Sequence, residues 1–204
     1  MNARVRRFLA HPAGTGVFWL LVLWPGVGLM VAAALNALGA NPAEALIRST
    51  GDWTLRFLCL TLAVTPLRLM LGWPELARRR RGFGLATYAY ASLHLFGYAW
   101  LDMGFLWPDV LKDIAKRNFI AVGMLAWVLL SLLAASSFKR AIRWLGGVRW
   151  QRLHRAVYAV ALLALLHFFW MRSGKQDLAE VAVYALILGS LLAWRVWHAA
   201  RMRR

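Results

Sequence analysis

The chain has 204 residues, a formal net charge of +17 and one cysteine. Hydrophobic residues make up 61% of it and charged residues 16%, whereas soluble domains have about 45–50% and 25%. This composition excludes an ordinary soluble globule and indicates an integral membrane protein. The basic residues stand in short clusters between apolar segments, which argues against a nucleic-acid-binding protein. The lone Cys59 excludes both an intramolecular disulfide and a covalent CxxCH haem site.

Six apolar segments each approach the roughly 20 residues that a helix needs to cross a bilayer. Their short connections predict an all-α, six-helix transmembrane bundle that forms a single domain over residues 1–204. Arginines precede the first segment as in a signal peptide, but that segment is too long for one, and we expect a retained helix. Pro25 and Pro66 predict local kinks rather than breaks. The predicted spans are 15–36, 53–72, 83–103, 118–137, 152–171 and 178–198.

The basic residues are unevenly divided between the two ends of these spans. One side carries 18 of the 25 Lys and Arg but only Glu75 of the acids, and the other side is neutral. The positive-inside rule then predicts that both termini are cytoplasmic. We interpret the run Arg78–Arg81 most simply as a topology signal. Alternatively, its guanidinium groups would bind phosphate or propionate groups. The opposite loop, 104–117, is either an interfacial turn anchored by Trp107 or part of a docking face for an external partner.

Two histidines lie at similar depth in apolar segments that are predicted to run in the same direction. His94 follows Arg81 by thirteen residues and His167 follows Arg155 by twelve, which is about 20 and 18 Å along a helix. An intramembrane histidine is a functional-site candidate, and neutral imidazole is a standard haem ligand. We therefore predict that His94 and His167 bind one haem iron from opposite faces. The alternative for each is a bond to a neighbouring carbonyl or serine.

His154 is a further candidate ligand, for a second haem or another inner cofactor. It precedes His167 by thirteen residues, about 20 Å towards the cytoplasm but about 220° around the helix. The mirror position on the third span falls at 80–81, where no histidine occurs. The remaining candidates for a partner of His154 are His11 and His198. Alternatively, its ring would face a flavin, a quinone or a haem propionate. His11 and His198 otherwise stand among terminal basic residues, where we expect solvated side chains.

Gly84, Gly97 and Gly123 are candidates for close approach of a flat macrocycle.

Four features together resemble the MsrQ family (formerly YedZ), within the wider ferric-reductase-like transmembrane group that includes NADPH oxidases. They are the six-helix frame and three stretches, TGDWTLRFLCLTLAVTPLR (50–68), RRGFGLATYAYASLHLFGYAWLDMG (80–104) and WQRLHRAVYAVALLALLHFFW (150–170). The resemblance covers roughly residues 15–198. It implies b-type haem held by His94 and His167, with His154 as the third histidine of the family pattern, and it implies bound FMN.

The resemblance also implies a bacterial inner-membrane protein that passes electrons outwards. The donor would be the quinone pool or a cytoplasmic flavin reductase. The acceptor would be MsrP, a periplasmic molybdopterin enzyme that reduces methionine sulfoxide in proteins, so that catalysis takes place in the partner. Unlike NADPH oxidases, the chain shows no appended flavin and nicotinamide domain and no second histidine on its third span. A separate donor is therefore expected. The missing histidine counts against a second bis-histidine haem, and the haem count is left at one or two.

Three other functions compete with this interpretation. The first is a stand-alone ferric reductase-type cytochrome b. The second is a small proton-coupled transporter whose histidines relay protons, although the acids lie at the ends of spans. The third is a cofactor-free assembly subunit. Bound haem separates the cytochromes from the other two.

Overall fold

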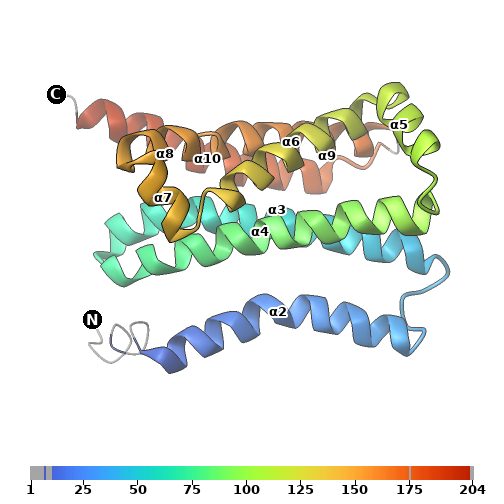
Figure 1. Ribbon diagram of the computed structural model, residues 1–204, viewed down its shortest axis with the longest axis horizontal. Coiled ribbons are helices and arrows are strands. Elements are labelled where there is room, and N and C mark those ends of the chain that lie inside the picture. The colour runs from blue at the N-terminus through green and yellow to red at the C-terminus, as the bar shows by residue number, and fades with distance from the viewer. Residues whose placement is uncertain (1–6, 8–10, 175, 203–204) are drawn as a thin grey trace. The chain divides into compact units, whose positions relative to one another are not determined.

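The computed structural model describes residues 7, 11–174 and 176–202, and its regular elements in these ranges are all helices (Figure 1). The chain divides into two compact units, Met1–Asp102 and Met103–Arg204, which are described separately below. Several basic residues that contribute to the predicted charge asymmetry lie outside the described residues, namely Arg4, Arg6, Lys175, Arg203 and Arg204.

The first unit contains α2 (Pro12–Ala34), α3 (Pro42–Leu71), the 3₁₀ turn η1 (Pro74–Leu76), α4 (Ala77–Gly97) and a π-helical turn η2 (Tyr98–Asp102) that continues α4. The second contains α5 (Trp107–Lys116), α6 (Asn118–Ala135), α7 (Lys139–Leu145), α8 (Gly147–His154), α9 (Val157–Ser173) and α10 (Ala179–Arg201).

Within the described residues, five helical segments are long and apolar enough to cross a membrane. They are α2, α3, α6, the continuous pair α8–α9 and α10, and they coincide with five of the six predicted spans. The remaining predicted span, 83–103, falls on α4 and η2. Helix α4 begins with arginines at 78–81 and carries polar residues further along. It is therefore less apolar than the five helical segments named above. The multi-pass character is confirmed, while the sixth span and the cytoplasmic termini stay predictions.

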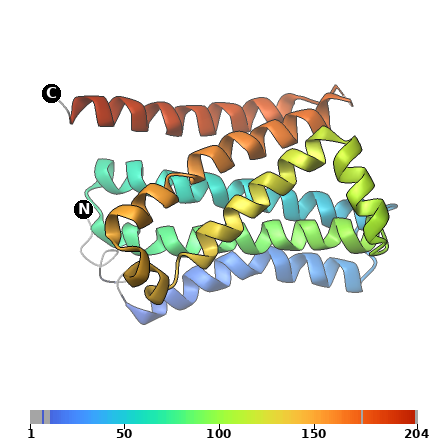
Figure 2. The same cartoon turned by 45° about the horizontal axis from the view of Figure 1, so that its top comes forward.

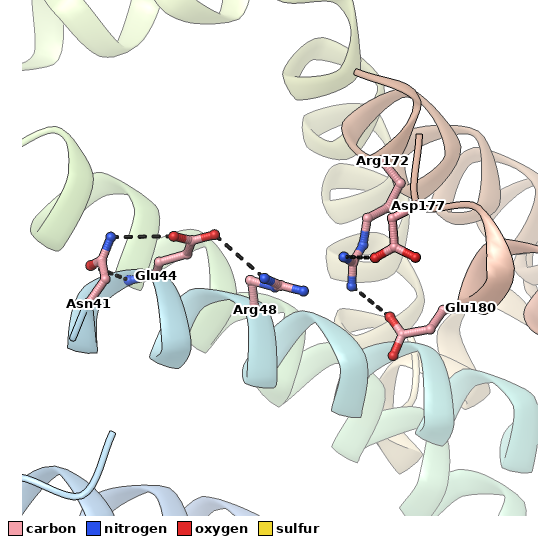
Figure 3. Close-up of polar contacts among 6 residues, drawn as sticks. All are labelled: Asn41, Glu44, Arg48, Arg172, Asp177 and Glu180. Atoms are coloured by element: carbon pink, nitrogen blue, oxygen red, sulfur yellow. Dashed lines mark hydrogen bonds and ion pairs between the residues drawn. The ribbon is translucent and has the colours of Figure 1, made fainter. Parts of the chain in front are cut away.

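Helix α3 begins at Pro42, well before the boundary predicted at residue 53. The side chain of Asn41 caps it by accepting a hydrogen bond from the N–H of Glu44 (3.2 Å), and Pro42 occupies the first helical position. Glu44 also pairs with Arg48 one turn later (Figure 3). The helix ends where Gly72 adopts a left-handed conformation with φ of 66°. Local capping therefore extends α3 beyond its apolar stretch.

Helix α2 passes through Pro25 without a break, as predicted, and Tyr90 of α4 supports it there. The Tyr90 hydroxyl accepts from the N–H of Gly26 (2.8 Å) and donates to the carbonyl of Val22 (2.9 Å). Gly26 and Val22 are four residues apart, so the hydroxyl bridges a donor and acceptor that a straight helix would pair directly. Tyr90 is 4% exposed, and it fixes α2 to α4 at the proline.

Substituting phenylalanine for Tyr90 should destabilise the first unit without altering its helices. The ring would still pack against Phe57, but two backbone groups of α2 would lose a partner in an apolar setting. We expect the free energy of unfolding to fall by about 1 kcal/mol. Unfolding of the purified protein in mixed micelles measures this, with Tyr158→Phe on α9 as the control, because phenylalanine keeps the ring contact of Tyr158 with Arg195. Equal stability of the two variants would contradict the bridging role.

The second unit is built on α6 and α9, which run antiparallel, with α10 packed on α9 (Figure 2). Residues 107–116 of the loop that joins the units form α5, where Asp113 is buried and pairs with Arg117 (2.7 Å). At the far end of α9, the buried Arg172 donates to Asp177 (2.7 Å) and Glu180 (2.6 Å) (Figure 3). These two ion pairs fix the turn between α9 and α10.

Candidate functional site

His94 lies in the last turn of α4, where the neighbouring helix α3 holds its ring. Its Nδ1–H donates to the backbone carbonyl of Ile47 (2.8 Å). Because a carbonyl only accepts, this bond assigns the neutral tautomer that has its proton on Nδ1 and its lone pair on Nε2. The hydroxyl of Thr50 donates to the same carbonyl (2.9 Å). The ring of His94 is thus oriented by backbone, and its lone-pair nitrogen points away from Ile47.

The same arrangement recurs in the second unit. His167 of α9 donates through Nδ1–H to the carbonyl of Phe119, near the start of α6 (2.7 Å). The rings of Phe119 and His167 also pack at 5.9 Å between centroids. His167 therefore has the same tautomer as His94, with the lone pair on Nε2. Each of these two histidines shows the carbonyl bond that the sequence left open as an alternative to ligation, and in each ring the bond is made by Nδ1.

A glycine lies beneath each of these rings. A Cβ built on Gly51 would lie 3.2 Å from Nδ1 and Cε1 of His94. A Cβ built on Gly123 would lie 2.8 Å from Nδ1 of His167 and 3.0 Å from its Cε1. In both units the glycine follows the accepting carbonyl by four residues, which is one helical turn.

The three glycines that the sequence suggested for close approach of a macrocycle face protein atoms instead. Gly123 lies beneath His167, a Cβ on Gly97 would meet Ile47 (3.2 Å), and one on Gly84 would meet Thr61 (3.8 Å). Small residues on these helices therefore serve close packing of side chains and neighbouring helices.

His154 has a different environment, at the end of α8. Its Nε2 hydrogen-bonds the hydroxyl of Ser136 (3.0 Å), and that hydroxyl donates to the carbonyl of Leu133 (3.1 Å). Because a hydroxyl both donates and accepts, the bond to Ser136 fits either neutral tautomer of His154. The Trp150 ring packs on His154 at 4.0 Å, and its Nε1–H donates to the Ser136 carbonyl (2.9 Å). His154 is thus part of a polar cluster that joins α8 to the end of α6.

The two remaining histidines have local partners. His11 caps α2 by accepting from the N–H of Ala13 (3.2 Å), and His198 stacks on Trp194 one turn earlier in α10 (4.8 Å). A pairing of either of them with His154 stays a prediction.

Taken separately, His94 and His167 each offer the neutral imidazole that haem iron takes from a protein. Across residues 7, 11–174 and 176–202, no group of three or more His, Cys, Asp or Glu side chains is placed to hold a metal ion. A porphyrin supplies four of the six iron ligands itself, so it needs only imidazoles from the protein. An Nδ1–H bonded to a carbonyl is the usual outer contact of a metal-bound histidine, because it fixes the ring and raises the basicity of Nε2.

Sequence reasoning found the three histidines but missed the groups that orient them. Backbone carbonyls have no sequence signature, so Ile47 and Phe119 were not identifiable. Trp150 precedes His154 by four residues, a spacing that places both on one helix face, and this signal could have revealed their contact.

Comparisons with known proteins identify relatives of the chain. Residues 50–165 match the family model described as "Ferric reductase like transmembrane component". A protein of Polaromonas naphthalenivorans is 56% identical over 200 residues, which cover 98% of this chain and 91% of that one. Relatives from Ralstonia nicotianae (49%, covering 91% and 86%) and Bordetella pertussis (50%, covering 80% and 79%) are also similar. All three are named as the haem-binding subunit MsrQ of protein-methionine-sulfoxide reductase.

The chain belongs to the MsrQ family. No solved structure matches it. The family-model match includes His94 and His154 and ends two residues before His167, whereas the relative from P. naphthalenivorans aligns with 98% of this MsrQ-family chain.

Proposed function

We propose that this protein transfers electrons across a membrane through b-type haem, with His94 and His167 as the two axial ligands of one iron. The observation that carries the proposal is the shared geometry of the two histidines. Each lies in a predicted membrane span, and each donates Nδ1–H to a carbonyl of a neighbouring helix. The family to which the chain belongs supports assigning both histidines to one iron. The similar depth predicted for them in their spans supports it as well.

The chain's own part in this function is to hold two imidazoles in a fixed tautomer and orientation. Bound haem supplies a one-electron couple, and two imidazole ligands leave no open position for oxygen chemistry. The carbonyls of Ile47 and Phe119 keep each Nδ1 protonated, which reserves Nε2 for the iron. The surrounding apolar helices exclude water, which lowers the local dielectric and so influences the redox potential.

The proposed partners follow from the family. Electrons arrive from the quinone pool or a cytoplasmic flavin reductase, with FMN as a second cofactor, and leave towards the periplasmic molybdopterin reductase MsrP. Reduction of methionine sulfoxide takes place on MsrP, so this chain is the electron-transfer subunit. Six spans in the bacterial inner membrane, with both termini cytoplasmic, complete the proposal.

A reduced-minus-oxidised visible spectrum of the detergent-purified protein tests the proposal directly. We expect sharp b-type bands, about one haem per chain, and bound flavin released as FMN on denaturation. A colourless protein after expression with ample haem would refute the cytochrome function and favour the transporter. Two haems per chain would mean that His154 is also a ligand.

A stand-alone ferric reductase is the second candidate, because the matching family model carries that description. The two functions differ in the acceptor. In proteoliposomes with reduced haem, we expect rapid reoxidation by purified MsrP and slow reoxidation by a ferric chelate. The reverse order would favour the ferric reductase.

We further propose that His154, whose Nε2 is hydrogen-bonded to Ser136, faces an inner cofactor and leaves the haem to the other two histidines. His154→Ala should then keep the b-type bands and lower the amount of bound FMN. Ser136→Ala removes the hydrogen bond but keeps the imidazole, so its effect on FMN should be smaller. Haem and flavin per chain, measured for both variants, decide the point. Loss of haem in His154→Ala alone would show that His154 is a ligand.

A further inference from the structure

Both proposed ligands are held by the same three-part arrangement, although they lie in different units. It consists of a histidine, the carbonyl that accepts from its Nδ1, and a glycine four residues after that carbonyl. In the first unit these are His94, Ile47 and Gly51, and in the second they are His167, Phe119 and Gly123. The carbonyl fixes the edge of the ring, and the glycine allows the ring to lie against the helix.

The distances show that a side chain at either glycine would compete with the imidazole. A Cβ at position 123 would be 2.8 Å from Nδ1 of His167, closer than real Cβ atoms approach other heavy atoms. A Cβ at position 51 would be 3.2 Å from His94, a contact that a shift of a few tenths of an ångström would relieve. Since Nδ1 is itself bonded to the carbonyl, the ring of His167 cannot move without lengthening that bond.

We propose that Gly51 and Gly123 are positioning residues for haem ligation. They leave room for each imidazole to reach its carbonyl, and they thereby set the tautomer and the plane of each axial ligand. This inference rests on the proposed function, because it assigns the two glycines to the ligands named there. It goes beyond that function in naming the residues that determine ring orientation.

Glycines that only let helices pack closely would behave differently. Gly97 is such a case, because a Cβ there would meet the aliphatic side chain of Ile47 rather than an imidazole. A packing role affects stability alone. A positioning role also changes the electronic signature of the iron and the hydrogen bond of the ring, so these are the quantities to measure.

The test compares Gly123→Ala and Gly51→Ala with two matched controls. Gly84→Ala places its Cβ 3.8 Å from Thr61, an ordinary contact, and Gly189→Ala on α10 meets nothing within 4 Å. The readouts are haem retained per chain, the low-spin ferric EPR signal and the midpoint potential. For Gly123→Ala we expect about 10- to 100-fold weaker haem retention, the usual cost of disturbing an outer contact of a ligand. Gly51→Ala should keep its haem but shift the EPR signal and the potential, and both controls should match the wild type.

Histidine NMR of the haem-free protein provides a readout that does not depend on haem. With ¹⁵N-labelled histidine, the hydrogen-bonded Nδ1–H of His167 should give a protected proton signal that disappears in Gly123→Ala. If Gly123→Ala does not accumulate in membranes, the milder Gly51→Ala decides by its EPR signal and potential. The inference is overturned if the glycine variants match the controls in these readouts while His94→Ala and His167→Ala lose haem. Full haem in both histidine variants would instead overturn the ligand assignment of the proposed function.

Discussion

Replacing His94 or His167 with alanine is expected to abolish the b-type haem spectrum while the protein still inserts into the membrane. On the proposed function, each substitution removes one of the two imidazoles that would hold the haem. Both histidines are partly buried in apolar helices, so alanine is well tolerated by the helix itself. We expect haem retention to fall by at least about 10-fold in each variant, since even outer-contact changes cost that much.

The controls for this prediction come from the other histidines. His11→Ala and His198→Ala alter histidines with local partners, a helix cap and a stacked tryptophan, and should keep the full spectrum. His94→Gly and His167→Gly leave space for added imidazole, which should restore part of the low-spin signal. Protein amount is measured in the same membranes by an epitope tag. A normal spectrum in both alanine variants would show that these residues are not the ligands.

Hydropathy predicted six spans, and five of them coincide with helices long and apolar enough to cross a membrane, because a bilayer imposes a length and an apolarity that are directly readable. It failed at the start of α3, where Asn41, Pro42 and Glu44 form a capping signal in a polar stretch. There the backbone continues as a helix beyond the apolar segment, since capping satisfies its first N–H groups. The predicted span 83–103 is not among these five, because the helix that contains it, α4, begins with the arginines at 78–81 and carries polar residues further along.

Only the histidine side chains of the candidate site could be predicted from the sequence, and not the groups that accept their hydrogen bonds. An imidazole in an apolar helix is conspicuous in sequence, and His94, His154 and His167 were all identified that way. What distinguishes them is the nitrogen that each uses locally, Nδ1 in His94 and His167 and Nε2 in His154. That difference depends on which backbone or hydroxyl group the fold brings to the ring. Spacing along one helix carries no information about an acceptor on another.

The proline in α2 illustrates the same limit. The sequence predicted a kink at Pro25 because proline lacks an N–H. It did not identify the residue that supports the helix at that point. Tyr90 is 64 positions away in sequence and reaches Gly26 only because α2 packs on α4. That packing depends on another close approach, between Gly82 of α4 and the Phe18 ring of α2.

Substituting leucine for Gly82 should therefore separate α2 from α4. A Cβ at this position would lie 2.5 Å from Phe18 Cε1 and 2.6 Å from its Cζ, and leucine adds three further carbons. The Phe18 ring is packed edge-on against Phe83 (4.9 Å) and lies beneath the guanidinium of Arg79 (5.2 Å). Overpacking of this kind costs about 1–3 kcal/mol of unfolding free energy, and it should also weaken the Tyr90 bridge to α2.

A double-mutant cycle makes this prediction specific to the contact. Phe18→Ala alone should destabilise the protein, because its ring packs on the buried cluster that includes Phe57 and Tyr90. In the Gly82→Leu background, however, the same change removes the obstructing ring and should restore part of the lost stability, giving a favourable coupling energy. Gly189→Leu on α10, where a Cβ meets nothing within 4 Å, controls for the effect of leucine itself. Additive effects of Phe18→Ala and Gly82→Leu would show that this contact does not hold α2 in place.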